Sequence, residues 1–594
     1  MDDTKTMCGI FGYIGTKTNA AETVLEGLKL LEYRGYDSWG VAVKDGNKIE
    51  VDKHIGKIGN ATVSLPSSNL GIGHTRWATH GGVTDANAHP HVDCTKEIAV
   101  IHNGIIENFE ELKEELIQKG HTFISETDTE VVPHLIEENL KTRGFTTAVR
   151  DAFNRLSGMN AIVVAYAPSK EIIAAKNGSP LVIGIGDGEL FIASDAIGIV
   201  KHTKKVVFLN DHQMAILGNN LKILQLPDGH ELTPKIEELD WKFEEVTLGE
   251  YPHFFLKEIH EEPVTVEHIA LNALETTQKF AEYINNAYGT FMLGCGSASY
   301  AGIAATYLFS KIAKKHINFV IGSEFKYFED FVTEKTLLIP ISQSGESIDV
   351  IDPVTRMKNE KGVKIASVVN TLGSTLYRMS DFRALLECGP EKAVVATKSF
   401  IAMLSMLLLT AYTVAGKQKE GQEHLLKAAE DIKSILGTAS LEHIKSVAES
   451  LKEKDHIYII GRGLSYAAAL EATLKLKEAS YIHAKAFPGG ELKHGVMALI
   501  EKGTPCIVFA PHDETFEEII SNAQEVKARG GYIIGIGPKQ NKVFDAFLPT
   551  ADISDATLLP QVAISHLLAY YVAIARGVED PDKPRNLAKS VTVK

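Results

Sequence analysis

Residues 290–299 read TFMLGCGSAS, and residues 456–465 read HIYIIGRGLS. Both segments consist of an apolar, strand-like run, a Gly-x-Gly turn and a hydroxyl residue, and an alanine-rich stretch typical of a helix follows each. Two further apolar runs follow at similar distances in each copy, at 336–341 and 364–369 in the first and at 505–510 and 532–535 in the second. Strands that alternate with helices are typical of a parallel sheet. The repeat therefore predicts two copies of one α/β domain.

The two copies differ where the second strand of each is followed by a helix. The first copy reads SQSGES at 342–347, and hydroxyls and backbone N–H groups at the start of a helix suit a phosphate. Neither a Walker sequence nor a complete GxGxxG occurs, which favours a small phosphorylated molecule over a nucleoside triphosphate or a dinucleotide. The second copy reads APHDET at 510–515. We therefore expect one copy to bind phosphate and the other to contribute different groups.

Candidate acid–base residues follow the second Gly-x-Gly. Lys475 and Glu478 share a predicted helix face with Glu471, a pattern that also fits a solvated row of ion pairs. His494 lies in a glycine-rich loop, where functional residues are frequent. A lysine, a glutamate and a histidine that meet at a phosphosugar suit proton transfer next to a carbonyl. In the tail, Lys589 is a candidate for an imine-forming lysine.

The first 225 residues or so show short strand-like runs and paired helical patterns, which predict an α+β layered domain. Residues 228–263 are charged and irregular, and the segment includes or adjoins four prolines, at 227, 234, 252 and 263, which suggests a connector between domains. The expected division is 1–7 (extension or propeptide), 8–226, 227–280 (linker and connecting helix), 281–425, 450–583 and 584–594 (tail).

Cys8 lies in the segment MCGIFGYIG at 7–15. If Met7 is the true start and is removed, Cys8 carries both a thiol and an α-amine, whose ordinary pKa of about 7.7–8.0 lets it accept the thiol proton. The alternative is a small buried cysteine at the start of a strand. Asn103 and Gly104 follow a strand, and an amide side chain with the next backbone N–H makes a good oxyanion pair. Residues 125–130 fit a helix-capping sequence.

Composition narrows the class of protein. The chain has 594 residues, 44% of them hydrophobic, and a formal net charge of −15, which predicts two to four domains and disfavours nucleic-acid and anionic-membrane partners. Five scattered cysteines without a CxxC spacing argue for a reducing compartment, with neither a disulfide framework nor a zinc site. We expect no metal, because the histidines of residues 74–91 lack ligand spacing. Residues 400–415 predict a buried helix, and no signal peptide is visible.

From Cys8 to Lys594, the chain is similar to the glucosamine-6-phosphate synthase family. The motifs that carry this resemblance lie at 8–12, 33–38, 74–81, 102–108, 342–347, 475–478, 491–495 and 585–593. Members of that family are glutamine–fructose-6-phosphate aminotransferases (isomerizing). The resemblance implies an α+β N-terminal-nucleophile glutaminase domain with αββα layers, followed by two α/β sugar-isomerase (SIS) domains.

In the glutaminase half, the resemblance makes Cys8 the nucleophile with its own amine as base, and Asn103 with Gly104 the oxyanion hole. Arg76 and Asp128 grip the α-carboxylate and the α-amine of glutamine. The whole glutamine-binding set is Arg76, Thr79, His80 and Asp128. Trp77 resembles the gate of a channel that keeps ammonia away from water, where it is protonated and loses its nucleophilicity.

In the isomerase half, the resemblance implies that Lys589 forms an imine with open-chain fructose 6-phosphate and that His494 assists ring opening. Glu478, helped by Lys475, moves the proton between C1 and C2. The residues that hold the sugar phosphate are Ser297, Ser342, Gln343, Ser344, Ser347, Val394 and Ala588. Three features depart from the family pattern: the residues before Met7, which acylate the Cys8 amine if they are retained, Ala298 in place of a serine and Trp39 in place of a small residue.

The expected partners are L-glutamine and D-fructose 6-phosphate, with no cofactor, in a cytoplasmic homodimer. Two other functional classes of protein share part of this pattern. A phosphoribosyl-pyrophosphate-type amidotransferase requires an acidic V-D-D-S-x-x-R-G-T loop, which is absent. A regulatory protein that only binds a sugar phosphate needs the 342–347 loop but not Glu478, His494 and Lys589, so their presence argues against it.

Overall fold

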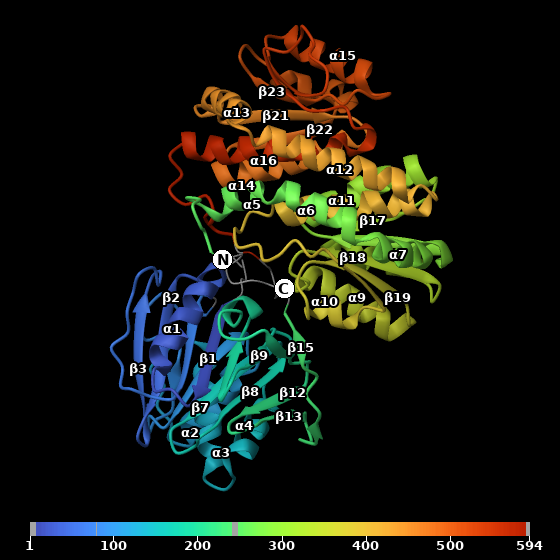
Figure 1. Ribbon diagram of the computed structural model, residues 1–594. Coiled ribbons are helices and arrows are strands. Elements are labelled where there is room, and N and C mark those ends of the chain that lie inside the picture. The colour runs from blue at the N-terminus through green and yellow to red at the C-terminus, as the bar shows by residue number, and fades with distance from the viewer. Residues whose placement is uncertain (1–7, 79, 240–246, 588, 590–594) are drawn as a thin grey trace. The chain divides into compact units, whose positions relative to one another are not determined.

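The computed structural model describes residues 8–78, 80–239, 247–587 and 589. The chain divides into two compact units, one of Met1–Thr247 with Asn586–Lys594 and one of Leu248–Arg585 (Figure 1). We call them unit 1 and unit 2 and describe each by itself.

Unit 1 contains two antiparallel sheets. The first has the strand order β15-β11-β9-β10-β1-β4-β2-β3. Its strands are β1 (Gly9–Gly15), β2 (Ser38–Asp45), β3 (Lys48–Ile55), β4 (Leu70–Arg76), β9 (Val182–Ile185), β10 (Glu189–Ala193), β11 (Lys205–Phe208) and β15 (Glu237–Glu238). The second sheet has the order β14-β13-β12-β8-β7-β6-β5. Its strands are β5 (His91–Val92), β6 (Ile98–Gly104), β7 (Asn160–Tyr166), β8 (Ile172–Asn177), β12 (Gln213–Leu217), β13 (Leu221–Gln225) and β14 (Glu231–Leu232).

Helices cover the outer faces of both sheets. Helix α1 (Ala20–Leu31) packs on β1 and β4, and α2 (Phe109–Gln118), α3 (Val131–Leu140) and α4 (Phe145–Phe153) pack on the second sheet. Strand β1 shows why the layers form, because its side chains alternate between faces. Ile10 and Ile14 join the core between the sheets, whereas Phe11 lies against α1, so close that a Cβ on Gly27 would come within 2.4 Å of its ring. Unit 1 is therefore an αββα sandwich, as predicted.

Unit 2 contains two parallel five-stranded sheets, one from each repeat. The first has the order β17-β16-β18-β19-β20 and the second the order β22-β21-β23-β24-β25. The strands of the first are β16 (Gly289–Gly294), β17 (Asn318–Ile321), β18 (Thr336–Ser342), β19 (Lys364–Val369) and β20 (Phe382–Leu385). Those of the second are β21 (His456–Gly461), β22 (His483–Pro488), β23 (Pro505–Phe509), β24 (Tyr532–Gly537) and β25 (Ala546–Pro549). The matching orders confirm the predicted repeat.

Helices fill the space between the two sheets and cover their outer faces (Figure 1). One continuous core contains Ile339 of the first sheet, Ile459 of the second and most of α11 and α16. The helices are α5 (Phe254–His260), α6 (Glu262–Asn272), α7 (Leu274–Asn286), α8 (Ser297–Leu308), α9 (Ile348–Lys361), α10 (Thr375–Met379), α11 (Lys398–Val414), α12 (Gln418–Ile435), α13 (Thr438–Leu451), α14 (Ser465–Ser480), α15 (Phe516–Lys527) and α16 (Leu558–Ala575).

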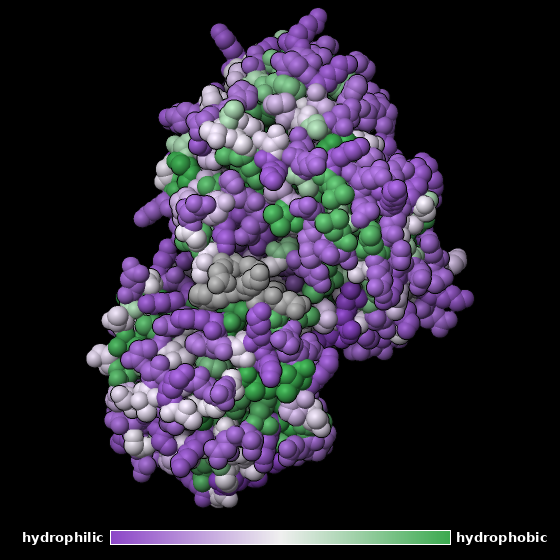
Figure 2. All heavy atoms as spheres, viewed as in Figure 1, coloured by the Kyte–Doolittle hydropathy of each residue, from purple (hydrophilic) through white to green (hydrophobic). Residues whose placement is uncertain are grey.

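Two long apolar helices lie in this core. Helix α11 is buried along almost its whole length, as predicted for residues 400–415. Among the described residues one segment, Ser554–Ala575, is long and apolar enough to cross a membrane, but 83% of its most apolar window is buried inside the protein. Its polar side chains are also paired, since Gln561 accepts a hydrogen bond from Ser465 at 2.9 Å. On the surface shown in Figure 2, hydrophilic residues predominate and hydrophobic residues form scattered patches.

The predicted connector is more regular than its composition suggested. Two short strands, β14 and β15, add to the sheets of unit 1, and α5 and the start of α6 belong to unit 2. Pro263 stands in the first turn of α6, where the missing N–H has no helical partner to lose. Pro263 therefore marks the start of a helix, whereas Pro227, Pro234 and Pro252 lie outside helices and strands.

Candidate active sites

Cys8 lies directly before β1 in unit 1, half-buried among backbone groups of the neighbouring strand. Its Sγ accepts a hydrogen bond from the Trp77 N–H at 3.3 Å, and the next residue, Gly9, donates its N–H to the Thr75 hydroxyl at 3.1 Å. Burial raises the pKa of the Cys8 thiol to about 11, although Arg76 and Arg34 oppose the shift. At neutral pH the thiol is therefore protonated, and it needs a base before it can attack.

Asn103 stands at the end of β6 and faces Cys8. Its Nδ2 donates to the Cys8 carbonyl oxygen at 2.9 Å, and its Oδ1 lies 3.1 Å from His74 Nε2. Burial lowers the pKa of His74 to about 3, so the ring is neutral. Because Nε2 also lies 2.9 Å from the His102 carbonyl, it carries the proton and fixes which way the Asn103 amide points.

Gly104 follows with a φ of +134°. A Cβ at this position would lie 2.2 Å from the Met159 carbonyl oxygen. Any other residue would therefore strain the backbone and displace β7. The close approach of the Met159 carbonyl oxygen explains why a glycine follows Asn103.

Two buried charges of opposite sign belong to this site, because the Arg76 guanidinium interacts with both the Cys8 thiol and the Asp128 carboxylate. Arg76, at the end of β4, donates to the carbonyl oxygens of His80, Gly81 and Gly82 and so holds this loop. Asp128 accepts the Ile106 N–H at 2.8 Å. Burial lowers the pKa of Arg76, and the carboxylates of Asp37 and Asp128 partly oppose this shift. The pair can complement a ligand that carries both a carboxylate and an ammonium group.

The other predicted residues of this loop have separate surroundings. The Trp77 ring is half-buried and meets the Tyr36 ring edge-on at 5.0 Å, and the His80 ring meets Phe109 at 5.7 Å. Thr79 lies outside the described residues. Trp39, which departs from the family pattern, stacks on His54 at 4.5 Å.

Sequence reasoning did not assign a role to several residues that position Cys8. Arg34 donates to the Cys8 carbonyl at 3.3 Å and pairs with Asp195 at 3.4 Å, and Tyr33 donates to the same carboxylate at 2.7 Å. The motif at 33–38 was the available signal. His74 and Thr75 likewise belong to the motif at 74–81, which does not assign them individual functions.

In unit 2, the loop 343–347 lies at the carboxyl end of the central strand β18. Ser342 Oγ accepts the Gly345 N–H at 3.0 Å and lies 3.5 Å from Ser347 Oγ, and Ser344 Oγ accepts the Glu346 N–H at 3.2 Å. The Gln343 carbonyl accepts the Asn370 N–H at 3.2 Å. Helix α9 begins directly afterwards. The loop thus gathers hydroxyls and N–H groups at the edge of a parallel sheet where ligands usually bind.

A buried chain of charges runs along one face of α14. Lys475 Nζ lies 3.3 Å from Glu471 Oε1 and 2.8 Å from Glu478 Oε2, and Ser297 at the start of α8 donates to Glu471 Oε1 at 3.0 Å. Glu471 and Lys475 are fully buried, whereas the Glu478 side chain is 17% exposed. The shared helix face is as predicted, but the solvated alternative is wrong. Glu478 is the end of the chain that a ligand can reach.

His566 on α16 completes this chain from the other side. Its Nδ1 lies 2.5 Å from Glu262 Oε1, and its Nε2 lies 3.7 Å from Glu471 Oε1. Burial lowers the pKa of His566, but attraction to Glu262 and Glu471 more than offsets this and raises it to about 9. Burial lowers the pKa of Lys475 as well, but the carboxylates of Glu471 and Glu478 on α14 outweigh it and raise this pKa. We call Glu262, His566, Glu471, Lys475 and Glu478 the buried charge chain.

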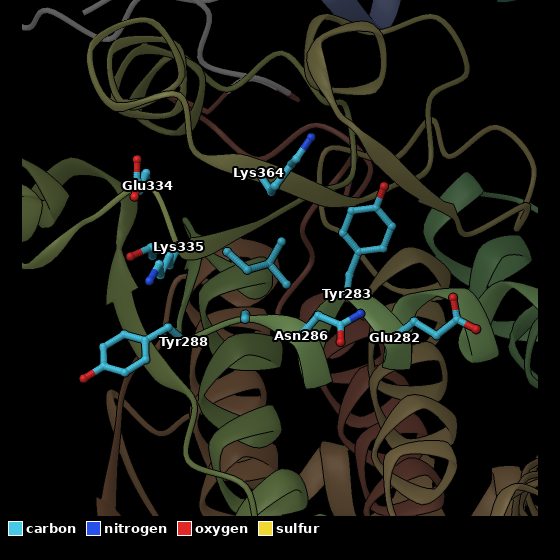
Figure 3. Close-up of a pocket in the computed structure, with 10 residues that line it drawn as sticks. Glu282, Tyr283, Asn286, Tyr288, Glu334, Lys335 and Lys364 are labelled. Atoms are coloured by element: carbon cyan, nitrogen blue, oxygen red, sulfur yellow. The ribbon is translucent and has the colours of Figure 1, made fainter.

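The equivalent loop of the second repeat is already occupied by a side chain. Lys311 Nζ lies 3.0 Å from Glu514 Oε1 and 2.9 Å from Asp555 Oδ1. This acidic loop repels phosphate and binds a lysine of the first repeat instead. A hollow of about 590 Å³ at the amino ends of β18 and β19 (Figure 3) is lined by Tyr283, Lys335 and Lys364, among others. It lies at the opposite edge of the sheet from the loop 343–347.

The structure also describes three further predicted residues of the isomerase half, His494, Val394 and Lys589. His494 is exposed in the loop after the turn Gly489–Lys493. Val394 is buried and donates its N–H to the Asp582 carbonyl at 2.9 Å. Lys589 is half-buried and belongs to unit 1, so its role toward groups of unit 2 stays a prediction. Ala588 lies outside the described residues.

Known proteins resemble both halves of the chain. A glutamine amidotransferase domain model matches residues 74–201, and a SIS domain model matches residues 283–412 and 450–544. Proteins named glutamine–fructose-6-phosphate aminotransferase [isomerizing] from Thermococcus kodakarensis and Pyrococcus horikoshii are 43% and 41% identical, over 99% of this chain and 100% of theirs. The solved C-terminal domain of glucosamine-fructose-6-phosphate aminotransferase from Francisella tularensis is 32% identical with a TM-score of 0.52, and covers 56% of this chain and 98% of its own.

These matches confirm the predicted fold class, an amidotransferase domain followed by two SIS domains. The chain belongs to the glutamine–fructose-6-phosphate aminotransferase (isomerizing) family.

Proposed function

We propose that the protein converts L-glutamine and D-fructose 6-phosphate into L-glutamate and D-glucosamine 6-phosphate, the first step of hexosamine synthesis. The arrangement of Asn103 and the oppositely charged pair Arg76 and Asp128 around Cys8 carries the proposal for the glutaminase half. Family membership joins this half to an isomerase half with its own loop for a phosphate. We further propose a cytoplasmic homodimer.

In the glutaminase reaction, Cys8 Sγ attacks the side-chain carbonyl of glutamine. The thiol proton goes to the α-amine of Cys8, which then delivers it to the leaving ammonia. Asn103 Nδ2 and the Gly104 N–H stabilise the oxyanion, and water later hydrolyses the thioester to glutamate. Arg76 and Asp128 bind the α-carboxylate and the α-ammonium, with Thr79 and His80 completing the glutamine site.

This chemistry requires that Cys8 be the first residue of the active protein. An amide nitrogen bonded to Met7 has no basic lone pair, so it cannot accept the thiol proton. Because the pKa of the Cys8 thiol is raised, the side chain does not lose this proton without a base. We favour an initiation site at Met7, followed by removal of that methionine. Removal of a propeptide is the second route, and a retained extension makes the glutaminase inactive.

In the isomerase reaction, the loop of Ser342, Gln343, Ser344 and Ser347 binds the phosphate, with Ser297 beside it. Lys589 forms an imine with the C2 carbonyl of the open-chain sugar, releasing water, and ammonia displaces the lysine. Glu478 then moves a proton between C1 and C2 while Lys475 steadies its charge. His494 assists ring opening, Val394 and Ala588 contact the sugar, and Trp77 gates the passage of ammonia.

Substitution of the nucleophile separates the two halves. Cys8→Ala is expected to abolish glutamine-dependent formation of glucosamine 6-phosphate and to leave the isomerisation of fructose 6-phosphate unchanged. The isomerisation rate serves as the internal control for folding. Glucosamine 6-phosphate made from glutamine by this variant would contradict the assignment of Cys8. Borohydride reduction with fructose 6-phosphate should label Lys589, and a label on another lysine would contradict its role.

A further inference from the structure

Four side chains with metal-binding atoms converge in unit 1, away from Cys8. Cys94, His121, His134 and Glu137 each direct one such atom to a common point, and all four atoms lie within 4.8 Å of one another. Cys94 belongs to the turn between β5 and β6, His121 follows α2, and the other two lie one turn apart on α3. Both histidines are buried, and Cys94 is exposed.

The separations between these atoms fit a tetrahedral ion. With Zn–S of about 2.3 Å and Zn–N and Zn–O of about 2.0–2.2 Å, a tetrahedron places sulfur about 3.6 Å from nitrogen and nitrogen about 3.4 Å from oxygen. Cys94 Sγ lies 3.8 Å from His121 Nδ1 and 3.7 Å from His134 Nδ1. Glu137 Oε2 lies 3.0 Å from His121 Nδ1 and 3.4 Å from His134 Nδ1.

Carboxylates also stand behind the histidines, as they do around metal sites. His121 Nε2 lies 2.8 Å from Glu138 Oε1, which Lys141 also contacts. His134 Nε2 is buried without a hydrogen-bond partner, and its nearest carboxylate oxygen, Glu130 Oε1, is 3.9 Å away. In His121 the contact with Glu138 places the proton on Nε2 and leaves the Nδ1 lone pair for the cluster.

We propose that Cys94, His121, His134 and Glu137 form a four-coordinate structural Zn²⁺ site. A thiolate and two imidazoles select zinc over magnesium or calcium, and the thiolate and one carboxylate neutralise its two positive charges. Four protein ligands leave no position for a substrate, which is typical of structural zinc. The proposal departs from the expectation that the chain binds no metal, which rested on the spacing of the cysteines and of the histidines at 74–91.

The position of the site indicates what the ion does. It joins the β5–β6 turn to α2 and α3, and β6 ends at Asn103 while Asp128 lies just before α3. Zinc thus ties together the outer ends of the elements that carry the oxyanion amide and a glutamine-binding carboxylate. Its contribution is to the order of unit 1 and not to a chemical step.

Metal analysis of the full chain, purified without chelators or metal-affinity steps, tests the proposal. We expect about one zinc per chain by mass spectrometry in the wild-type protein and in Cys8→Ala, and loss of that zinc in Cys94→Ser and His134→Gln. Two matched controls, Glu114→Gln on the exposed side of α2 and His230→Gln on a surface turn, should keep it. Stripped protein titrated with Co²⁺ should show thiolate-to-cobalt charge-transfer absorption that saturates at one equivalent and disappears in Cys94→Ser.

Glu138→Gln provides a test that keeps all four ligands and the fold. Because it weakens the partner behind His121 and, apart from that, the pair with the exposed Lys141, we expect zinc affinity to fall about 10- to 100-fold, with an unchanged circular dichroism spectrum of the zinc-loaded protein. A wild-type chain that holds no zinc and shows no saturable cobalt absorption would overturn the proposal. So would zinc that persists at wild-type stoichiometry in Cys94→Ser and His134→Gln.

Discussion

Replacing Asn103 by alanine tests the geometry of the glutaminase site most sharply. The substitution removes the Nδ2 donor that lies 2.9 Å from the Cys8 carbonyl. It leaves no buried donor unpaired, because His74 Nε2 keeps its 2.9 Å contact with the His102 carbonyl. Removal of one oxyanion-hole donor costs about 2.7–4 kcal/mol in the transition state. The kcat for release of glutamate should therefore fall by about 10²–10³, with a small change in KM.

Asn103→Asp provides a matched comparison of nearly identical shape. Its carboxylate can still accept from His74, but it offers no donor and adds a negative charge next to the thiol, so its activity should be lower than that of Asn103→Ala. Initial rates of glutamate release measure both variants, and isomerisation of fructose 6-phosphate controls for folding. A kcat of Asn103→Ala within about fivefold of wild type would refute the assignment of this amide to the oxyanion hole, since that is under half of the expected free energy.

Three further predictions concern unit 2. Lys475→Met removes the nearer of the two cations beside the buried Glu471 carboxylate, at 3.3 Å against 3.7 Å for His566. Isomerisation should therefore be lost and the free energy of unfolding in urea should fall by about 3–5 kcal/mol; unchanged stability would contradict the burial of this pair. The His566 pKa of about 9 in the folded chain lies above the ordinary 6.5, so its stabilising charge is fully present below pH 6.5 and is lost as the pH rises through 9, a change of about 3 kcal/mol. The free energy of unfolding in urea should fall across this pH range in the wild type and should depend less on pH in His566→Gln. An equal pH dependence in the two proteins would refute this role of His566. Gly345→Ala places a Cβ 2.1 Å from Ser374 Oγ at a φ of +66°. The resulting strain of about 1–2 kcal/mol should raise the KM for fructose 6-phosphate about tenfold without changing the glutaminase activity. An unchanged KM would exclude this loop as the phosphate site.

Local sequence patterns predicted those elements of the fold that depend on residues close together in the sequence. The repeated strand and Gly-x-Gly turn predicted two parallel sheets, and the spacing of Glu471, Lys475 and Glu478 predicted a shared helix face. The burial of that face could not be predicted, because it depends on α8 and α16. Ser297 and His566 contact Glu471 from 174 and 95 residues away in the sequence. No pattern in the sequence near α14 indicates these contacts.

The cluster around Cys94 shows the same limit. Its ligands come from three segments, and only His134 and Glu137 are close enough in sequence to look like a motif. Segment 554–575 resembles a membrane span in length and apolarity, and its burial between two sheets is a tertiary property that no local pattern shows. The connector was predicted as irregular because prolines and charges dominate it, whereas pairing with existing sheet edges forms β14 and β15.

The central claim is that Cys8, with a free α-amine, supplies ammonia from glutamine to a sugar phosphate bound by the same chain. The most direct measurement uses protein whose first residue is Cys8, confirmed by intact mass, with amide-labelled glutamine and fructose 6-phosphate. The label should appear in glucosamine 6-phosphate, with one glutamate formed for each product molecule, and protein that retains residues 1–7 should be inactive in this assay. Absence of label from the sugar, or equal activity with residues 1–7 retained, would contradict it.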